Sequence, residues 1–306
     1  MEWVFLPSLM ECNSNQQTPN WRAYLILGRI SNLPTVWSNC LVGWLMGDGM
    51  GIGGAVGWGV LLWLCLGGTL LYVGGMYLND AFDAGFDRQF RKERPIPAGH
   101  VKEETVWLLG WGQMVLGFAC LVFGCQVSWI IALMLVGSII LYDAVHKHVP
   151  FSPVIMAACR FFLVLAAFDA SGNPWQGYAL WPAFALAAYI IGLTYVAKRE
   201  STGGVISFWP CLLIVAPILL SYLVNNGRYF WLGILTSLVL AAWIVYCLQF
   251  VLRTDKVQIF KTVSGLLAGI ALVDMVAIVG QDPYWLGIMF LLFLSALLFQ
   301  RFVPAT

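Results

Sequence analysis

The fold of this chain is decided by a run of charges that follows a long apolar segment. Residues 79–95 read Asn-Asp-Ala-Phe-Asp-Ala-Gly-Phe-Asp-Arg-Gln-Phe-Arg-Lys-Glu-Arg-Pro, and the preceding residues 57–78 are almost entirely apolar. One charge at the hydrocarbon centre of a bilayer costs roughly 2.5–3.5 kcal/mol on insertion scales, so charges in a membrane segment usually belong to a functional site. The run therefore predicts a membrane helix that ends in the protein's chemical site.

The composition is that of a membrane protein. The 306 residues are 60% hydrophobic and only 10% charged, whereas soluble domains carry about 25% charged residues. The net charge is +1 and there is no basic tail, so we expect no nucleic-acid partner. The eight cysteines are scattered without metal-ligand spacing, which favours buried apolar roles over disulfides or a zinc site.

The apolar segments predict an all-α, polytopic transmembrane helical bundle. A membrane helix needs about 20 mostly apolar residues, and backbone polar groups in lipid must be satisfied within the segment, which favours helices. We expect nine to ten spans. The candidate segments lie near residues 30–47, 57–79, 104–123, 127–145, 152–169, 178–197, 205–225, 229–251, 261–280 and 284–302.

The chain is expected to hold one membrane domain. Residues 1–21 form a short polar extramembrane segment without the pattern of a cleavable signal peptide, and residues 22–306 form a single transmembrane domain. Lysine and arginine concentrate in one set of alternating loops, whereas the other set holds only Arg228. Since cytoplasmic loops carry the excess of basic residues, we expect both termini and the charged run to be cytoplasmic.

Three aspartates of the run share one helix face. At about 100° per residue, Asp80, Asp83 and Asp87 fall within an arc of roughly 60°. Their hard oxygens suit magnesium, which proteins typically hold through one or two carboxylates together with phosphate oxygens of the substrate. The spacing therefore predicts Mg²⁺ bound by these three residues and bridged to a phosphorylated substrate.

The polar and basic neighbours of the aspartates allow two interpretations. In the first, Asn79, Arg88, Arg91 and Arg94 bind a diphosphate group, because the basic side chains cluster where its charge would need neutralising. In the second, the segment is a solvated helix end whose acids simply pair with these arginines. The first interpretation is favoured because the motif begins at the membrane boundary.

The same residues carry a family resemblance. The pattern Asn79-Asp80-x-x-Asp83-x-x-x-Asp87, followed by Arg94-Pro95-Ile96-Pro97-Ala98-Gly99, resembles the first aspartate-rich motif and the next loop of UbiA-family intramembrane prenyltransferases. The likeness covers about residues 22–250. It implies a bundle around a central lipid-accessible cavity and a Mg²⁺-dependent transfer of an isoprenyl group from a prenyl diphosphate to an aromatic or lipid-like acceptor. The implied partners are these substrates and membrane lipid, and the oligomeric state is left open.

Further residues match the family in order along the chain. Tyr142 and Lys147 resemble its Tyr/Lys-bearing segment, and Arg160 resembles the arginine of its fifth helix. The resemblance implies diphosphate contacts for Lys147 and Arg160. For Lys147, an ion pair with Asp143 one helical turn away is the simpler structural alternative. The expected catalytic residues are Asp83, Asp87, Lys147 and Tyr195.

The second aspartate-rich motif of the family is divergent in this chain. The corresponding stretch reads Tyr195-Val-Ala-Lys-Arg-Glu-Ser-Thr-Gly-Gly204, with Glu200 as its only carboxylate and as a candidate metal ligand. Lys198 and Arg199 are predicted to clamp the diphosphate directly, replacing charge that a second metal would supply. Alternatively, the second site has decayed and the protein is a non-catalytic isoprenoid-binding subunit of a biosynthetic or export assembly. A third interpretation treats these charges as an ordinary cytoplasmic helix end.

Overall fold

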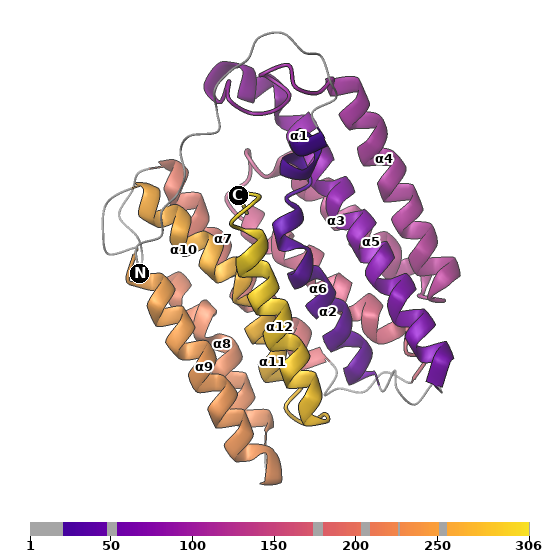
Figure 1. The fold of residues 1–306 in the computed structure, drawn as a ribbon, viewed down its shortest axis with the longest axis vertical. Helices are drawn as coiled ribbons and strands as arrows, with labels where there is room; N and C mark the ends of the chain where they lie inside the picture. The colour runs from indigo at the N-terminus through magenta and orange to yellow at the C-terminus, as the bar shows by residue number, and fades with distance from the viewer. Residues whose placement is uncertain are drawn as a thin grey trace.

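The computed structural model describes residues 21–47, 54–173, 180–202, 209–225, 227–250 and 256–305. These ranges form helices and turns without a strand, which confirms the all-α prediction for the described part of the chain (Figure 1). The helices are α1 (Trp21–Leu27), η1 (Ile30–Asn32), α2 (Leu33–Met46), α3 (Gly54–Phe90), α4 (Glu103–Ala119), η3 (Cys120–Gly124), α5 (Trp129–Val145), α6 (Ser152–Asp169), α7 (Leu180–Thr202), α8 (Trp209–Val224), η5 (Gly227–Tyr229), α9 (Phe230–Leu248), α10 (Lys256–Ala268), α11 (Ile270–Ala277) and α12 (Pro283–Phe299).

The helices form a multi-pass membrane bundle, although fewer reach full span length than predicted. Within the described residues, 6 helices are long and apolar enough to cross a bilayer. They are Gly57–Phe90, Glu103–Gly124, Ser152–Asp169, Leu180–Lys198, Gly227–Leu248 and Phe260–Ala277, and shorter apolar helices cover Trp129–Val145, Leu212–Val224 and Pro283–Phe299. The first predicted span falls on α2, whose 14 residues cover about 21 Å of a hydrocarbon layer about 30 Å thick.

Helix α3 carries the acidic motif without interruption. It has 37 residues, which corresponds to about 55 Å and exceeds the thickness of the hydrocarbon layer. The predicted span 57–79 therefore continues through the charged run to Phe90. The helix ends as the Arg91 N–H donates to the Asp87 carbonyl at 2.8 Å, and the following loop turns at Gly99, whose φ of 75° suits glycine.

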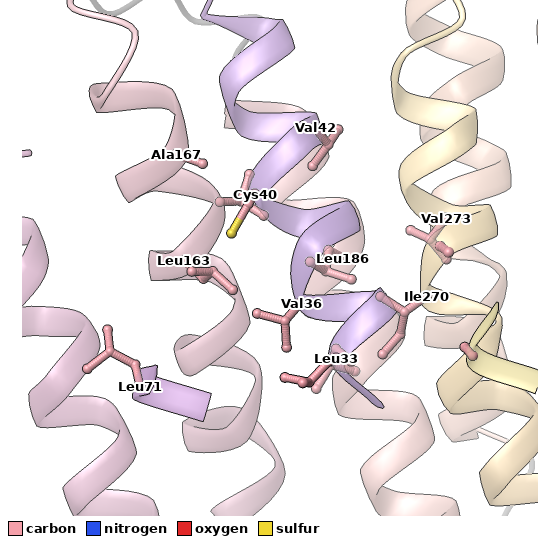
Figure 2. Close-up of a cluster of buried hydrophobic side chains, with 14 of the residues drawn as sticks. Leu33, Val36, Cys40, Val42, Leu71, Leu163, Ala167, Leu186, Ile270 and Val273 are labelled. Carbon is pink, nitrogen blue, oxygen red and sulfur yellow. The ribbon is translucent and has the colours of Figure 1, made fainter. Parts of the chain in front are cut away.

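Helix α2 is short but lies at the centre of the bundle. Figure 2 shows it between α6, from which Leu163 and Ala167 project, and α11, which contributes Ile270 and Val273. Most of its side chains are buried on every face, as expected for a helix that is enclosed by others. Gly43 allows a close approach to α6, because an added Cβ would collide with the Val164 carbonyl oxygen.

The last described residues return to the start of α2. The Asn32 side-chain amide donates to the Ala305 carbonyl at 2.9 Å, and the Ser31 hydroxyl donates to the Pro304 carbonyl at 3.4 Å. Figure 1 accordingly places the C-terminal end close to α1. Arg29, just before η1, is paired with Asp80 at the acidic end of α3. The tail after α12 therefore lies at the same end of the bundle as the acidic motif.

Candidate active site

A cavity of about 210 Å³ lies inside the bundle. Its walls come from α2, α3, α5, α6, α7, α10 and α11, and most of the lining side chains are apolar. An apolar pocket with a few convergent polar groups is the usual form of a ligand site. The polar lining residues are Arg29, Asn32, Tyr72, Tyr142, Asp143, Arg160 and Thr194.

The three aspartates of the motif are buried on the last turns of α3. Asp80, Asp83 and Asp87 are 6%, 6% and 1% exposed, so they face neighbouring segments rather than solvent. They adjoin the cavity through two residues that line it, because Arg29 contacts Asp80 and Asp143 contacts Asn79. We call Asp80, Asp83, Asp87 and Asp143 the acidic cluster.

Two arginines from outside α3 neutralise one end of the acidic cluster. Arg94 Nη1 lies 2.6 Å from Asp80 Oδ1 and 3.6 Å from Asp87 Oδ2. Arg29 Nη2 lies 3.8 Å from Asp80 Oδ1. The backbone of Arg29 is left-handed, with a φ of 43°, a conformation that is uncommon for residues other than glycine and often marks a functional constraint.

The charge on Arg29 is secure in this position. Burial by itself lowers the pKa of the guanidinium. The Asp80 carboxylate and, to a smaller extent, Tyr72, Tyr142 and Asp143 raise this pKa and outweigh the effect of burial. The net shift raises the pKa of Arg29 above its usual value. Arg29 is therefore a permanent cation at the junction between the acidic cluster and the cavity.

Asp83 is held by residues that follow α5. Lys147 Nζ lies 2.7 Å from Asp83 Oδ1, and His146 Nε2 lies 3.6 Å from Asp83 Oδ2. The Lys147 ammonium also sits 4.1 Å from the centre of the Phe86 ring, a favourable cation–π position. The interpretation that Lys147 pairs with Asp143 is therefore wrong, because approach of α3 to α5 offers a closer carboxylate.

Asp143 has a different kind of partner. Its Oδ1 accepts a hydrogen bond from Asn79 Nδ2 at 3.1 Å, and its side chain is only 3% exposed. Its Oδ2 is buried without a hydrogen-bond partner among the described residues. The amide of Asn79, predicted to contact a diphosphate, is thus already bound to a carboxylate.

Two further arginines of the charged run, Arg88 and Arg91, have different surroundings. Arg88 is paired with Glu103 of α4 on an exposed face of the bundle, so the structure does not bring it to the acidic cluster. Arg91 follows Asp87 by one turn and its side chain is partly buried. Of the three arginines of the charged run that are predicted to bind a diphosphate, Arg94 has direct contacts with the aspartates.

The divergent second segment lies at the end of α7. Lys198 Nζ donates to the Val149 carbonyl at 3.1 Å and to Ser152 Oγ at 3.3 Å, which joins α7 to the connection between α5 and α6. Tyr195 packs against Trp209, with ring centres 4.6 Å apart. The side chains of Arg199 and Glu200 lie outside the described part of the structure.

Arg160 belongs to a polar network deep in the bundle. Its Nη1 donates to Asn39 Oδ1 at 2.8 Å and its Nη2 donates to Thr35 Oγ1 at 3.2 Å. The guanidinium lies 5.5 Å from the Tyr72 ring centre, and Tyr72 precedes Asp80 by eight residues, or about 12 Å along the helix axis. Arg160 is therefore held by side chains of α2 while it lines the same cavity as Arg29 and Asp143.

The same network accounts for an acid inside α11. Asp274 Oδ2 accepts hydrogen bonds from Ser38 Oγ at 2.6 Å and from Asn39 Nδ2 at 2.7 Å. Asn39 thus links Asp274 to Arg160 through its two amide atoms. Sequence reasoning missed this bridge, because its members lie in helices far apart along the chain.

The order of these residues along the chain agrees with one known family. The sequence profile of the UbiA prenyltransferase family matches residues 40–270. This chain belongs to the UbiA prenyltransferase family. The resemblance carried by the aspartate motif is thereby confirmed.

Two curated relatives of this chain are distant in sequence. The chain is 29% identical over 176 residues to a digeranylgeranylglyceryl phosphate synthase of Methanoregula boonei, which covers 58% of each protein. It is 26% identical over 188 residues to a 4-hydroxybenzoate octaprenyltransferase of Hydrogenovibrio crunogenus, which covers 58% of this chain and 64% of the relative. The chain therefore spans less than two thirds of the length of these relatives.

Solved structures of UbiA proteins share the fold. A structure described for a digeranylgeranylglyceryl phosphate synthase in membranes has a TM-score of 0.61 at 20% identity, covering 86% of this chain and 99% of that one. A UbiA homologue from Aeropyrum pernix K1 has a TM-score of 0.62 at 14% identity, covering 84% and 99%. The UbiA helical bundle is thus shown for this chain.

Magnesium is the cofactor that the UbiA family implies, and the acidic cluster fits it in part. Within the described residues, no group of three His, Cys, Asp or Glu side chains could hold a metal ion by itself. Asp87 Oδ1, however, is buried and has no hydrogen-bond partner among the residues that the structure describes. Since proteins commonly hold magnesium through one or two carboxylates plus substrate phosphates, Asp87 with Asp83 or Asp80 offers suitable donors for an ion that a diphosphate completes.

Proposed function

We propose that this UbiA-family protein transfers an isoprenyl group from a prenyl diphosphate to an aromatic or lipid-like acceptor, with magnesium as cofactor. The observation that carries the proposal is the position of the acidic cluster beside a mainly apolar cavity. A prenyl diphosphate has the same two parts, a charged head and an apolar chain. The names of the two curated relatives support an aromatic or a glyceryl phosphate acceptor.

The acidic and the basic residues of the site are proposed to have different roles in the reaction. Asp80, Asp83 and Asp87 would hold magnesium, which when bound supplies positive charge beside the diphosphate as the allylic carbon–oxygen bond breaks. Arg29 and Arg94 already sit next to these carboxylates. Because the diphosphate gains charge as it leaves, fixed cations aimed at it lower the barrier.

Further roles follow from position. Lys147 is paired with Asp83 and is proposed to contact the departing diphosphate. Lys198 and Arg199 are proposed to contact it from α7, with Glu200 as an additional metal ligand and Tyr195 as a catalytic side chain. The apolar walls of the cavity would hold the prenyl chain and exclude water from the reactive carbon.

The orientation of the protein is part of the proposal. Residues 22–306 would form a single membrane domain, with the acidic cluster and both termini on the cytoplasmic side. The bias of lysine and arginine toward one set of loops supports this orientation. Prenyl diphosphates would then enter from the cytoplasm, where their charged heads are soluble.

Turnover by the purified protein tests the proposal. The protein in nanodiscs would receive magnesium, geranylgeranyl diphosphate and either 4-hydroxybenzoate or geranylgeranylglyceryl phosphate. We expect pyrophosphate and a prenylated product with one acceptor class, and neither with Asp83→Asn. Asp169→Asn is the control, because Asp169 ends α6 and does not line the cavity. This variant should behave as the unmodified protein. Equal turnover by Asp83→Asn and the unmodified protein would overturn the assigned site.

A non-catalytic isoprenoid-binding subunit is the second candidate function. It is favoured by the divergent segment, where Lys198 donates to Val149 and Ser152 and supports the helix packing. Such a protein would bind geranylgeranyl diphosphate tightly but release no pyrophosphate with either acceptor. Any acceptor-dependent release of pyrophosphate would exclude binding as its sole role.

A further inference from the structure

Among the described residues, one carboxylate of the acidic cluster forms no ion pair. Asp80 and Asp87 share Arg94, and Asp83 is paired with Lys147. Among the described residues, Asp143 forms no ion pair, and its polar contact is the Asn79 amide. Asp80, Asp83 and Asp87 are therefore paired with basic side chains, whereas Asp143 is hydrogen-bonded to a neutral amide.

The free oxygen of Asp143 lies at the cavity. Asp143 is a lining residue, its side chain is 3% exposed, and its Oδ2 has no hydrogen-bond partner in the described part of the structure. A buried polar atom without a partner is destabilising and calls for an explanation. The Asn79 hydrogen bond fixes Oδ1 and leaves Oδ2 as the available acceptor.

Prenyl transfer requires such an acceptor. When the allylic carbon–oxygen bond breaks, its electron pair leaves with the diphosphate. The new bond to the allylic carbon uses an electron pair of the acceptor's hydroxyl oxygen or aromatic ring. The acceptor must then lose the proton of that hydroxyl or ring carbon, and the mainly apolar cavity has few groups that can take it.

We propose that Asp143 is the catalytic base of the transfer, with Oδ2 accepting the proton that the prenylated acceptor loses. The carboxylate becomes a neutral carboxylic acid, so charge and atoms balance. The role rests on the proposed prenyl transfer. Asp143 suits it better than the other acids, because Asp80, Asp83 and Asp87 are committed to cations near the diphosphate.

The groups around Asp143 hold one of its oxygens and leave the other open to the cavity. Asn79 of α3 donates to its Oδ1, and its own helix presents Tyr142 to the same cavity. Arg29 lies at the cavity wall beside Asp80. His146 and Lys147 are directed toward Asp83 and leave Oδ2 open to a substrate.

Asp143→Asn tests the role with little change in shape. The new amide oxygen can still accept from Asn79, so the fold and the diphosphate site should persist. We expect turnover of geranylgeranyl diphosphate with the active acceptor to fall by about 10²–10⁴-fold, the usual contribution of a general base. The affinity for geranylgeranyl diphosphate, measured with magnesium and without acceptor, should stay within about threefold, well under the tenfold that 1.4 kcal/mol represents.

Two readouts separate this role from a structural one. Turnover should show a larger isotope effect in Asp143→Asn than in the unmodified protein, because proton removal becomes rate-limiting. The label is placed on the ring carbon of an aromatic acceptor, and a hydroxyl acceptor is compared in light and heavy water. Asp143→Glu, which restores a carboxylate, should recover part of the activity. Asp169→Asn serves as the control for a carboxylate outside the cavity.

The outcomes distinguish the base from the reaction itself. Normal turnover by Asp143→Asn, or a loss of diphosphate affinity as large as the loss of turnover, would overturn the role of Asp143 while prenyl transfer stands. Absence of turnover by the unmodified protein with both acceptor classes would overturn prenyl transfer, and the base with it.

Discussion

The ammonium of Lys147 and the carboxylate of Asp83 lie 2.7 Å apart, although 64 positions separate them in the chain (Nζ to Oδ1). This ion pair connects the end of α5 to the last turns of α3. It brings the Tyr/Lys segment to the aspartate motif, so that a diphosphate bound by one would also be near the other. The pair is partly shielded from solvent, with 30% of the Lys147 side chain exposed.

Loss of the Lys147 charge should weaken substrate binding. Lys147→Met keeps an unbranched stem over Phe86 but removes the ammonium. We expect the affinity for geranylgeranyl diphosphate to fall about tenfold, or about 1.4 kcal/mol, a modest value because the pair is partly exposed. Titration in nanodiscs measures it. Lys147→Arg is the matched control, and equal losses in both variants would contradict a role for the charge.

Magnesium dependence should require the buried oxygens of Asp87. Chelation with EDTA is expected to lower the affinity of the unmodified protein for geranylgeranyl diphosphate by at least about tenfold, or 1.4 kcal/mol. Asp87→Asn should bind weakly with or without magnesium, because one ligand oxygen is replaced by an amide nitrogen. The comparison is made by isothermal titration in both buffers. Retained magnesium dependence in Asp87→Asn would remove this residue from the metal site.

Two arginines of the same charged run should differ sharply. Arg94 contacts Asp80 and Asp87, whereas Arg88 is paired with Glu103 on an exposed face. We expect Arg94→Gln to reduce turnover at least about tenfold more than Arg88→Gln, a difference of about 1.4 kcal/mol in the barrier. Steady-state pyrophosphate release compares them. Equal losses would show that the position of Arg88 in the structure is not the one that functions.

Packing of α2 against α6 should depend on one glycine. A Cβ at Gly43 would collide with the Val164 carbonyl oxygen and crowd the Ala167 Cβ, whereas a Cβ at Gly112 would meet nothing within 4 Å. Overpacking typically costs about 1–3 kcal/mol, so Gly43→Ala should lower the thermal unfolding midpoint in detergent. Gly112→Ala should leave it unchanged or raise it. Similar midpoints for both variants would contradict this packing.

Local features of the site could be predicted because they depend on residues close in sequence. The apolar run before Asn79 gives a helix, and the spacing of Asp80, Asp83 and Asp87 puts them on one face through the helical repeat. The motif itself identifies the family. The partners of these acids could not be predicted in this way. Arg88 and Arg94 are both close to the acids in the sequence, but Arg94 contacts the cluster and Arg88 does not.

The sequence by itself determined the helical membrane class, the acidic face of α3 and the family. Only the tertiary structure decided that Lys147 contacts Asp83 and that Asn39 bridges Arg160 to Asp274. It also decided that one oxygen of Asp143 has no hydrogen-bond partner in the described part of the chain. The physical reason is the range of the forces that select each feature. Helical periodicity acts over a few residues, whereas ion pairs and buried hydrogen bonds join whichever groups the packing of distant helices brings together.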